Sequence, residues 1–422
     1  MARVLTPTDG NAIMTLVARE ATGQASFATV NSSTFVSTGE TVLATGMENV
    51  FNAINLVLGR LVLAVRPYAG KFLTVQAADS GVYTNRYRKV SFYSKDALPS
   101  GYFNTNLFTN LADGYTAGDN GGASTHSQWE QHQAMPLEMN FGGSTVWDNC
   151  ITLYEDQVKM AFRSPEEWTR FVAGYLQEHA NDIEQQKEAF NRMVVLSKMA
   201  SIYDNAVNNS IAPESAVNLT AAFNTYFNIS PAYTTAELLS TYLKEFTEFA
   251  VATIKEYSDR LTDRSARFHD PMQKTVSGVN YHILRHTPKA DQRLILYGPL
   301  MKKVEALVMP EVFGPKYLEL GENYESVNYW QANDGSNDMG IDVTSAVYDH
   351  VTGTQIAGNN VALDNVVGIL FDRDAMLTDF QLESAYTTGI EARKGYRNTW
   401  LHVSRNAVVD QSENAILFYT KD

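Results

Sequence analysis

The chain has 422 residues, of which 44% are hydrophobic and 19% charged, a composition typical of a globular protein that can bury a core. Its formal net charge of −14 argues against a surface that holds nucleic acid tightly, since such surfaces depend on clustered Lys and Arg. The lone cysteine, Cys150, excludes an internal disulfide and fits a reducing cytoplasm. The sequence does not open on a signal peptide, and polar residues interrupt its most apolar stretch, Val50 to Val65, so we expect no membrane-spanning segment.

Residues 1–60 open with a region rich in Thr, Ser, Ala and Val that carries few charges. This composition is typical of a terminal arm whose order depends on its neighbours. The stretch Met47 to Leu58 has apolar residues at helical spacing and predicts a short helix. Gly59 and Pro67 then bracket a segment, Leu61 to Val65, that we expect to be extended.

The helical period disappears in residues 61–163. Two stretches, 81–95 and 144–162, are rich in aromatic and β-branched residues and predict extended chain. The polar, glycine-rich loop between them, 110–127, is longer than the roughly 12 to 15 residues that compact domains usually tolerate. Together these features predict a long projecting β-hairpin.

A strong helix start follows. Ser164 stands at the N-cap, a proline comes next, and Glu167 is placed to close a capping box. Apolar residues then recur at helical spacing to about Asn208, which gives a helix roughly 65 Å long, whereas a compact globule of this length is about 57 Å across. Either the helix breaks, near Gly174 or residues 179–182, or the molecule is flat and elongated with this helix as its spine.

The second half of the chain is expected to be α+β. Thr234 and Glu237 form another capping box and predict a second long helix. From Tyr281 onward, short strands and short helices alternate: residues 293–297 predict a strand, and residues 300–308 predict a helix.

The stretch Val366 to Leu377 holds the strongest candidates for chemistry. An apolar strand that runs into Asp372 and Asp374 resembles the nucleophile segment of haloacid-dehalogenase phosphatases, and such a pair also holds divalent metal in many sugar transferases. The residues that follow Asp374 are too few for the other strands of a phosphatase site. We favour a structural alternative, in which a strand ends at Phe371 and one of the two aspartates caps a following helix.

Three further groups resemble metal sites incompletely. His282 and His286 have the spacing of a zinc-binding helix, but no Glu follows the first His and the flanking residues favour strands. His126 and His132 lack a nearby Cys or clustered carboxylates. Residues 333–342 have the composition of a calcium loop but lack its required glycine. We predict that none of these groups binds metal.

Residues 85–95 interleave basic and aromatic side chains as single-strand nucleic-acid binders do. Because they stand in an acidic chain, a half-exposed strand is the better interpretation. The sequence has no glycine-rich phosphate loop, Gly-x-Ser-x-Gly elbow or paired CxxC motif. We therefore predict no catalytic, cofactor-binding or metal-binding residues, no cofactor, and no enzymatic activity.

The order of these elements resembles the major capsid proteins of tailed bacteriophages, whose fold is named after the Hong Kong phage. That family has an N-terminal arm, an extended β-hairpin called the E-loop, a peripheral domain with a long spine helix, an axial α+β domain, and last strands that return to the periphery. The resemblance places these parts at residues 1–60, 61–163, 164–280, 281–394 and 395–422, respectively. Phe371 to Ala375 also matches the Phe-x-Arg/Lys-Asp-Ala pattern that begins a late helix in this group, with Asp372 where histidine is common.

The resemblance implies a structural protein that self-assembles into the icosahedral shell around the double-stranded DNA of a tailed phage. It implies assembly in the bacterial host cytoplasm and a final place in the virion capsid. The implied partners are copies of the chain in hexamers and pentamers, a portal, and separate scaffolding or decoration proteins, with only weak contact to packaged DNA and none to membranes. An encapsulin-like compartment shell shares the fold and stays open as an alternative, although this chain is longer and has the hairpin and arm of a phage coat.

Some members of that family lock their shells with an isopeptide bond between an E-loop lysine and an asparagine of a neighbour. Lys71, Lys89 and Lys95 lie in or near the expected E-loop. Neither the acceptor asparagine nor the catalytic glutamate can be matched in this sequence, so the resemblance does not extend to the cross-link.

Overall fold

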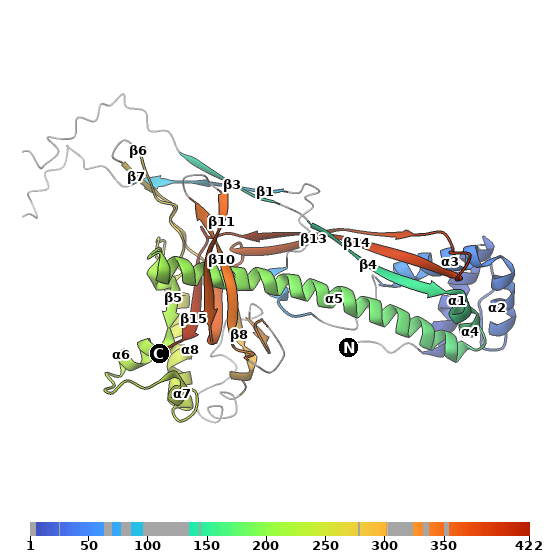
Figure 1. Cartoon of the computed structure of the whole chain (residues 1–422), viewed down its shortest axis with the longest axis horizontal. Helices are drawn as coiled ribbons and strands as arrows, with labels where there is room; N and C mark the ends of the chain where they lie inside the picture. Colours follow the sequence, from blue (N-terminus) through green and yellow to red (C-terminus); the bar gives the residue numbers. More distant parts are fainter. Residues whose placement is uncertain are drawn as a thin grey trace, which may run out of the picture.

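The longest element of the protein is the 39-residue helix α5 (Pro165–Tyr203). The computed structural model describes residues 6–24, 26–62, 70–76, 86–95, 135–142, 145–276, 279–300, 302, 324–331, 337–349 and 354–422. Helix α5 continues through Gly174 and residues 179–182 without a break. At about 1.5 Å per residue it is about 58 Å long, and the molecule is elongated along it (Figure 1). The long helix is confirmed, and the alternative of a break is wrong.

Local signals explain both ends of α5. The Ser164 hydroxyl accepts a hydrogen bond from the Glu167 N–H at 3.1 Å, and Pro165 occupies the first helical position. At the other end the helix passes into a π-helical turn, η3 (Asp204–Asn208), close to the predicted end.

A helical cluster surrounds the N-terminal end of α5 (Figure 1). Its members are α1 (Pro7–Thr22), α2 (Phe35–Ala44), α3 (Met47–Val62) and α4 (Glu155–Ala161). Phe35, Phe51 and Trp168 are fully buried in their shared core. The described part of residues 1–60 therefore differs from the expected arm, because these helices pack on one another and on α5.

Helix α3 also corrects the expected end of this region. It continues through Gly59 to Val62, so Leu61 and Val62 are helical rather than extended. The remainder of the expected extended segment, residues 63–65, lies outside the described residues. Gly59 does not stop the helix because an isolated glycine only weakens a helix interior.

A long three-stranded antiparallel sheet lies beside α5 (Figure 1). Its order is β13-β14-β4, formed by Met376–Thr387, Tyr396–Val409 and Thr145–Tyr154. Phe190 of α5 packs edge-on against Phe380 of β13. Residues 144–162 are thus only partly extended, since β4 gives way to α4. The expected boundary between residues 394 and 395 falls inside the β13–β14 hairpin.

The first strand of the predicted hairpin lies within the expected stretch 81–95, but its second strand lies outside the expected stretch 144–162. Strand β1 (Arg86–Phe92) pairs antiparallel with β3 (Pro136–Gly142), whereas β4 pairs with β14. The expected loop, 110–127, and the histidines at 126 and 132 lie outside the described residues. Beside this hairpin, β2 (Ser94–Lys95) joins β7 (Val279–His282), which pairs with β6 (Lys274–Val276).

A five-stranded sheet occupies the other end of α5. Its order is β5-β15-β12-β8-β9, from Ala216–Asn218, Ala415–Thr420, Asn365–Asp372, Gln292–Tyr297 and Tyr324–Val327. Alternate residues of β15 face opposite sides: Ile416 and Phe418 pack with the helices α6 (Leu219–Tyr226), α7 (Thr235–Leu238) and α8 (Leu243–Arg260). Leu417 packs instead with the C-terminal part of α5. The sheet is therefore covered on both faces.

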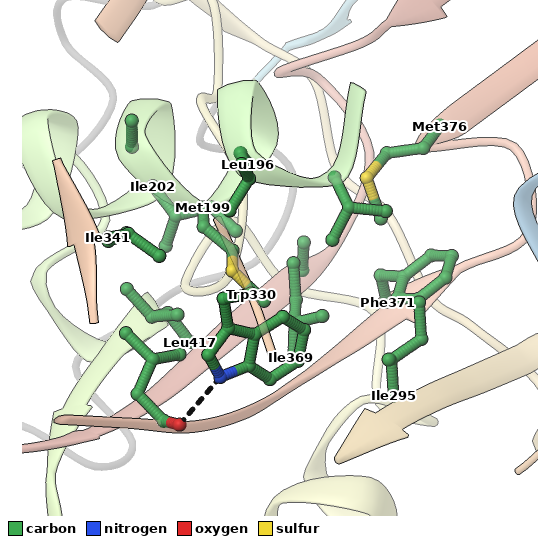
Figure 2. Close-up of a cluster of buried hydrophobic side chains, with 14 of the residues drawn as sticks. Leu196, Met199, Ile202, Ile295, Trp330, Ile341, Ile369, Phe371, Met376 and Leu417 are labelled. Carbon is green, nitrogen blue, oxygen red and sulfur yellow. Dashed lines mark hydrogen bonds between the residues drawn. The ribbon is translucent and has the colours of Figure 1, made fainter. Parts of the chain in front are cut away.

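The core between this sheet and α5 is centred on Trp330. Figure 2 shows its indole among Leu196, Met199, Ile369 and other apolar side chains, with a hydrogen bond of 2.9 Å from Nε1 to the Val366 carbonyl oxygen. The hairpin β10 (Ile341–Asp349) and β11 (Thr354–Leu363) packs beside it on α5. Short 3₁₀ turns complete the fold at Leu73–Val75, Pro213–Ser215 and Lys289–Asp291.

Two helix predictions in the second half need correction or stay open. The capping box of Thr234 and Glu237 forms as predicted, but α7 ends after one turn and α8 begins separately at Leu243. The predicted strand 293–297 is confirmed as β8, whereas most of the predicted helix 300–308 lies outside the described residues.

None of the helices in the described part of the chain has the length and apolar character needed to cross a membrane.

Candidate functional site

Asp372 stands in a tight turn between two strands. Strand β12 ends at this residue and β13 begins at Met376, so the predicted helix after it is wrong. Asp372 Oδ1 accepts a hydrogen bond from the Asp374 N–H at 2.9 Å, and its carbonyl oxygen accepts one from the Ala375 N–H. An aspartate that bonds the backbone two residues on forms an Asx turn, which uses the same contact type as a helix N-cap. The sequence signal was therefore real, but it marks a turn.

The second oxygen of Asp372 is also committed. Oδ2 accepts a hydrogen bond from the Thr287 hydroxyl at 2.8 Å, and the residue is only 7% exposed. The side chain of Asp374 is 66% exposed instead and lies beside Arg373. The two aspartates thus have separate surroundings, which does not suit a nucleophile working with a neighbouring acid and base.

Replacing Asp372 with alanine should lower the free energy of unfolding by about 1–3 kcal/mol, because it leaves the Thr287 hydroxyl and a turn N–H without their acceptor. Asp372→Asn keeps one acceptor oxygen and should cost less. Asp374→Ala is the matched control and should stay within about 0.5 kcal/mol of the wild type, since that side chain is exposed. Urea unfolding measures all three, and equal stability of Asp372→Ala and wild type would contradict the structural role.

A polar network leads from Asp372 into the interior. Thr287 accepts a hydrogen bond from Asn414 Nδ2 at 3.2 Å. Asn414 Oδ1 lies 2.8 Å from His269 Nδ1, and His269 Nε2 lies 2.9 Å from the Ile283 carbonyl oxygen. Burial lowers the pKa of His269 to about 4, against the opposing effect of these two contacts. The imidazole is therefore neutral at physiological pH.

This network adjoins a cluster of buried and half-buried charges, here called the junction cluster: Lys89, Lys198, Arg285, Asp410 and Glu413. Lys89 of β1 donates to both carboxylates in the turn between β14 and β15. Arg285 Nε lies 3.0 Å from Glu413 Oε1. Lys198 of α5 donates to the Asp410 carbonyl oxygen at 2.5 Å. The junction cluster thus joins the hairpin, the long helix and the approach to the five-stranded sheet.

The pKa values in the junction cluster reflect burial and mutual attraction. Burial opposes charge on both Lys89 and Asp410. The attraction and hydrogen bond between the two groups outweigh this cost of burial, so the pKa of Lys89 is raised and that of Asp410 is lowered. Burial dominates at Glu413 and raises its pKa despite Lys89 and Arg285. It also dominates at the fully enclosed Lys198 and lowers its pKa to about 8.

The segment before the hairpin, residues 70–76, is held by two carboxylates. Glu325 of β9 accepts hydrogen bonds from the backbone N–H groups of Phe72, Leu73 and Thr74. Glu188 of α5 accepts one from the N–H of Lys71 at 3.2 Å. This segment is therefore bound both to α5 and to the edge of the five-stranded sheet.

Of the three metal-like groups of the sequence, the described residues include both histidines of one, His282 and His286. His282 ends strand β7 and His286 follows in irregular chain, so their spacing does not place them on one helix face. His286 lines a surface depression of about 420 Å³ together with Arg285, Arg373 and Asp374. Residues 332–336 of the calcium-like segment lie outside the described residues. Within the residues that the structure describes, no group of three or more His, Cys, Asp or Glu could hold a metal ion.

A protein-family comparison covers most of these residues, but not Lys89 or residues 70–76. The model of the Phi29-like phage major capsid protein family matches residues 144–419. The chain belongs to this family. No curated protein matched the sequence in the corresponding search.

The capsid protein also resembles solved phage structures. A chain in the structure of head fiber and inner core protein gp22 of native bacteriophage P68 is 10% identical, with 85% of this chain and 86% of that chain covered and a TM-score of 0.51. The capsid of Staphylococcus phage Andhra gives 12% identity, coverage of 82% and 83%, and a TM-score of 0.47. The family match and the likeness to the P68 chain confirm the predicted α+β capsid-type fold, and the family match confirms the role as a structural protein of a tailed-phage head shell.

Sequence reasoning missed most of the junction cluster of this capsid protein. The sequence places Lys89 in the basic and aromatic stretch 85–95 and near the expected E-loop, but its bonds to Asp410 and Glu413 give it a role within the subunit. Lys198 was hidden in an apolar stretch of α5. The only signal for the partners was a pair of acidic residues between two apolar strands, which indicates a turn without naming its contacts.

Proposed function

We propose that this capsid protein forms hexamers and pentamers of an icosahedral shell that encloses the double-stranded DNA of a tailed phage. The observation that carries the proposal is the family match over residues 144–419, which covers both α5 and the two large sheets. An elongated subunit can contact several neighbours at once, and many weak contacts then hold each subunit. We infer assembly in the bacterial host cytoplasm, and family membership favours a phage shell over an encapsulin-like compartment.

We assign the parts of the shell subunit from the observed packing. The β1–β3 hairpin corresponds to the E-loop, and α5 with the three-stranded sheet corresponds to the spine and peripheral domain. The five-stranded sheet with its helices corresponds to the axial domain. Residues 216–260, which the sequence places in the peripheral domain, are assigned to the axial domain instead, because they pack on the five-stranded sheet.

The proposed role is structural rather than enzymatic. The buried, fully bonded carboxylate of Asp372 supports this, since a nucleophile must reach its substrate. A magnesium-dependent phosphatase activity that Asp372→Asn abolishes would instead support the enzyme alternative. We propose a portal and separate scaffolding or decoration proteins as further partners. The net charge of −14 supports only weak, non-specific contact with packaged DNA.

Sedimentation of the purified protein tests shell formation. We expect large, fast-sedimenting assemblies of the full chain, with scaffolding protein added where needed. A variant in which a short Gly-Ser linker replaces residues 96–134 should stay small while its circular dichroism remains that of a folded α+β chain. A full chain that stays monomeric under every assembly condition would contradict the proposal, whereas normal assemblies of the variant would refute only the assignment of the hairpin.

A further inference from the structure

Among the described residues, one face of the β1–β3 hairpin packs on the body of the subunit and the other carries exposed side chains. Met139 and Phe141 on that face pack with Met272, Ile283 and Val408 in a small apolar cluster. On the opposite face, Val90 is 49% and Phe92 is 62% exposed. A two-stranded hairpin is marginally stable by itself in water, so the contacts of its inner face must hold it in place.

The junction cluster supplies the polar part of these contacts. Lys89 donates to Asp410 and Glu413, and Ser91 accepts a hydrogen bond from Arg285 Nη2 at 2.7 Å. Both residues belong to β1, while the partners in these side-chain hydrogen bonds belong to the body. The register of β1 places Lys89 and Ser91 two residues apart, on the same face of the strand.

The body keeps partners for its own charges when Lys89 is removed. Asp410 Oδ1 accepts hydrogen bonds from both the N–H and the hydroxyl of Ser412 at 2.8 Å, and Lys198 bonds the Asp410 carbonyl oxygen. Glu413 keeps Arg285. Lys89 itself is 27% exposed at the side chain and can move into water without crossing the core. The junction cluster can thus open at Lys89 while the rest of it stays paired.

We propose that the junction cluster is a latch between the hairpin and the body of the subunit. With Lys89 seated between the two carboxylates, the hairpin is docked; with Lys89 withdrawn, β1 and β3 leave together while α5 and the five-stranded sheet stay folded. The latch is a property of the single chain and goes beyond the proposed shell function.

Hydrogen exchange of the unassembled chain, read by mass spectrometry, tests the latch. In Lys89→Met, a docked hairpin would hold an apolar chain against two buried carboxylates, so peptides from β1 and β3 should exchange about 100-fold faster than in wild type. Peptides from the C-terminal half of α5 and from β12 and β15 should keep their protection. Arg88→Met is the matched control, because Arg88 is the next residue and pairs with Glu138 on the exposed face. It should change exchange by no more than about threefold.

A milder variant covers the case in which Lys89→Met does not fold. Glu413→Gln removes one of the two charges that face Lys89 and should speed exchange of β1 and β3 by about tenfold. Wild-type protection of both strands in both variants would overturn the latch. Loss of protection throughout the body in either variant would overturn it as well, because the junction cluster would then support the whole fold. Since assembly is not measured, failure of the latch leaves the shell proposal untouched.

Discussion

Replacing Trp330 with alanine should lower the free energy of unfolding by about 3–5 kcal/mol, as large aromatic truncations in cores do. The indole is fully buried between α5 and the five-stranded sheet, so a smaller side chain at this position would leave a cavity. The change also leaves the Val366 carbonyl oxygen without the hydrogen bond from Nε1. Urea unfolding followed by circular dichroism measures the loss.

Two variants separate these contributions. Trp330→Phe keeps most of the apolar contact but not the hydrogen bond, so it should cost about 1–3 kcal/mol. Tyr226→Ala removes another aromatic ring, one that is 73% exposed, and should change stability by no more than about 0.5 kcal/mol. A loss below about 1 kcal/mol for Trp330→Ala would show that this core does not hold α5 to the sheet.

The second large effect concerns Lys198 and appears as a dependence on pH. Between about pH 8 and 10.5, the stability of wild type relative to Lys198→Met should rise by about 1.4 kcal/mol per pH unit. Burial lowers the pKa of Lys198 from 10.5 to about 8, so in this window the unfolded chain binds a proton that the folded chain does not. Raising the pH therefore favours the folded state.

The surroundings of Lys198 explain why burial dominates. Asp410, Glu413 and Asp270 favour its charge and Lys89 opposes it, yet the enclosure of the ammonium group outweighs the attraction. Lys244→Met, which removes an exposed lysine of α8, is the matched control and should show a constant difference from wild type over the same range. A constant difference for Lys198→Met as well would contradict a lowered pKa.

The parts of the fold that follow from local signals could be predicted from sequence. The start of α5 is encoded by Ser164 and the proline after it, and its length follows from a sustained helical period. Helix α1 also begins at a local signal, a capping box of Thr6 and Asp9, and it buries Ile13. Its many small residues, however, make the helical spacing of its apolar residues hard to recognise in the sequence. Composition alone suggested an arm where packing forms a helix.

At the β1–β3 hairpin and at the Asp372 turn, the same local sequence pattern is compatible with two different structures. Leu137, Met139 and Phe141 alternate as a half-buried strand should, but the stretch 144–162, with its aromatic residues, predicts the second strand of the hairpin as well. At Asp372, the side chain bonds the backbone two residues on, as a capping residue also can. Only the pairing of β13 with β14 decides that a strand follows.

The junction cluster lies beyond sequence reasoning because its contacts are long-range. Lys89 and Asp410 are separated by 321 positions, and nothing near either residue indicates the other. The turn after β14 and the strand β1 meet only once α5 and both sheets are in place. Such contacts follow from the completed fold, which a single sequence does not specify residue by residue.

Electron microscopy of purified assemblies tests the central claim, that this protein is the repeating unit of a shell, most directly. We expect closed particles whose reconstruction shows one long helix lying beside a three-stranded sheet in every subunit, with hairpins reaching neighbouring subunits. Under assembly conditions that include scaffolding protein, a field that contains only single subunits, or particles whose subunits lack this helix and sheet, would contradict the account.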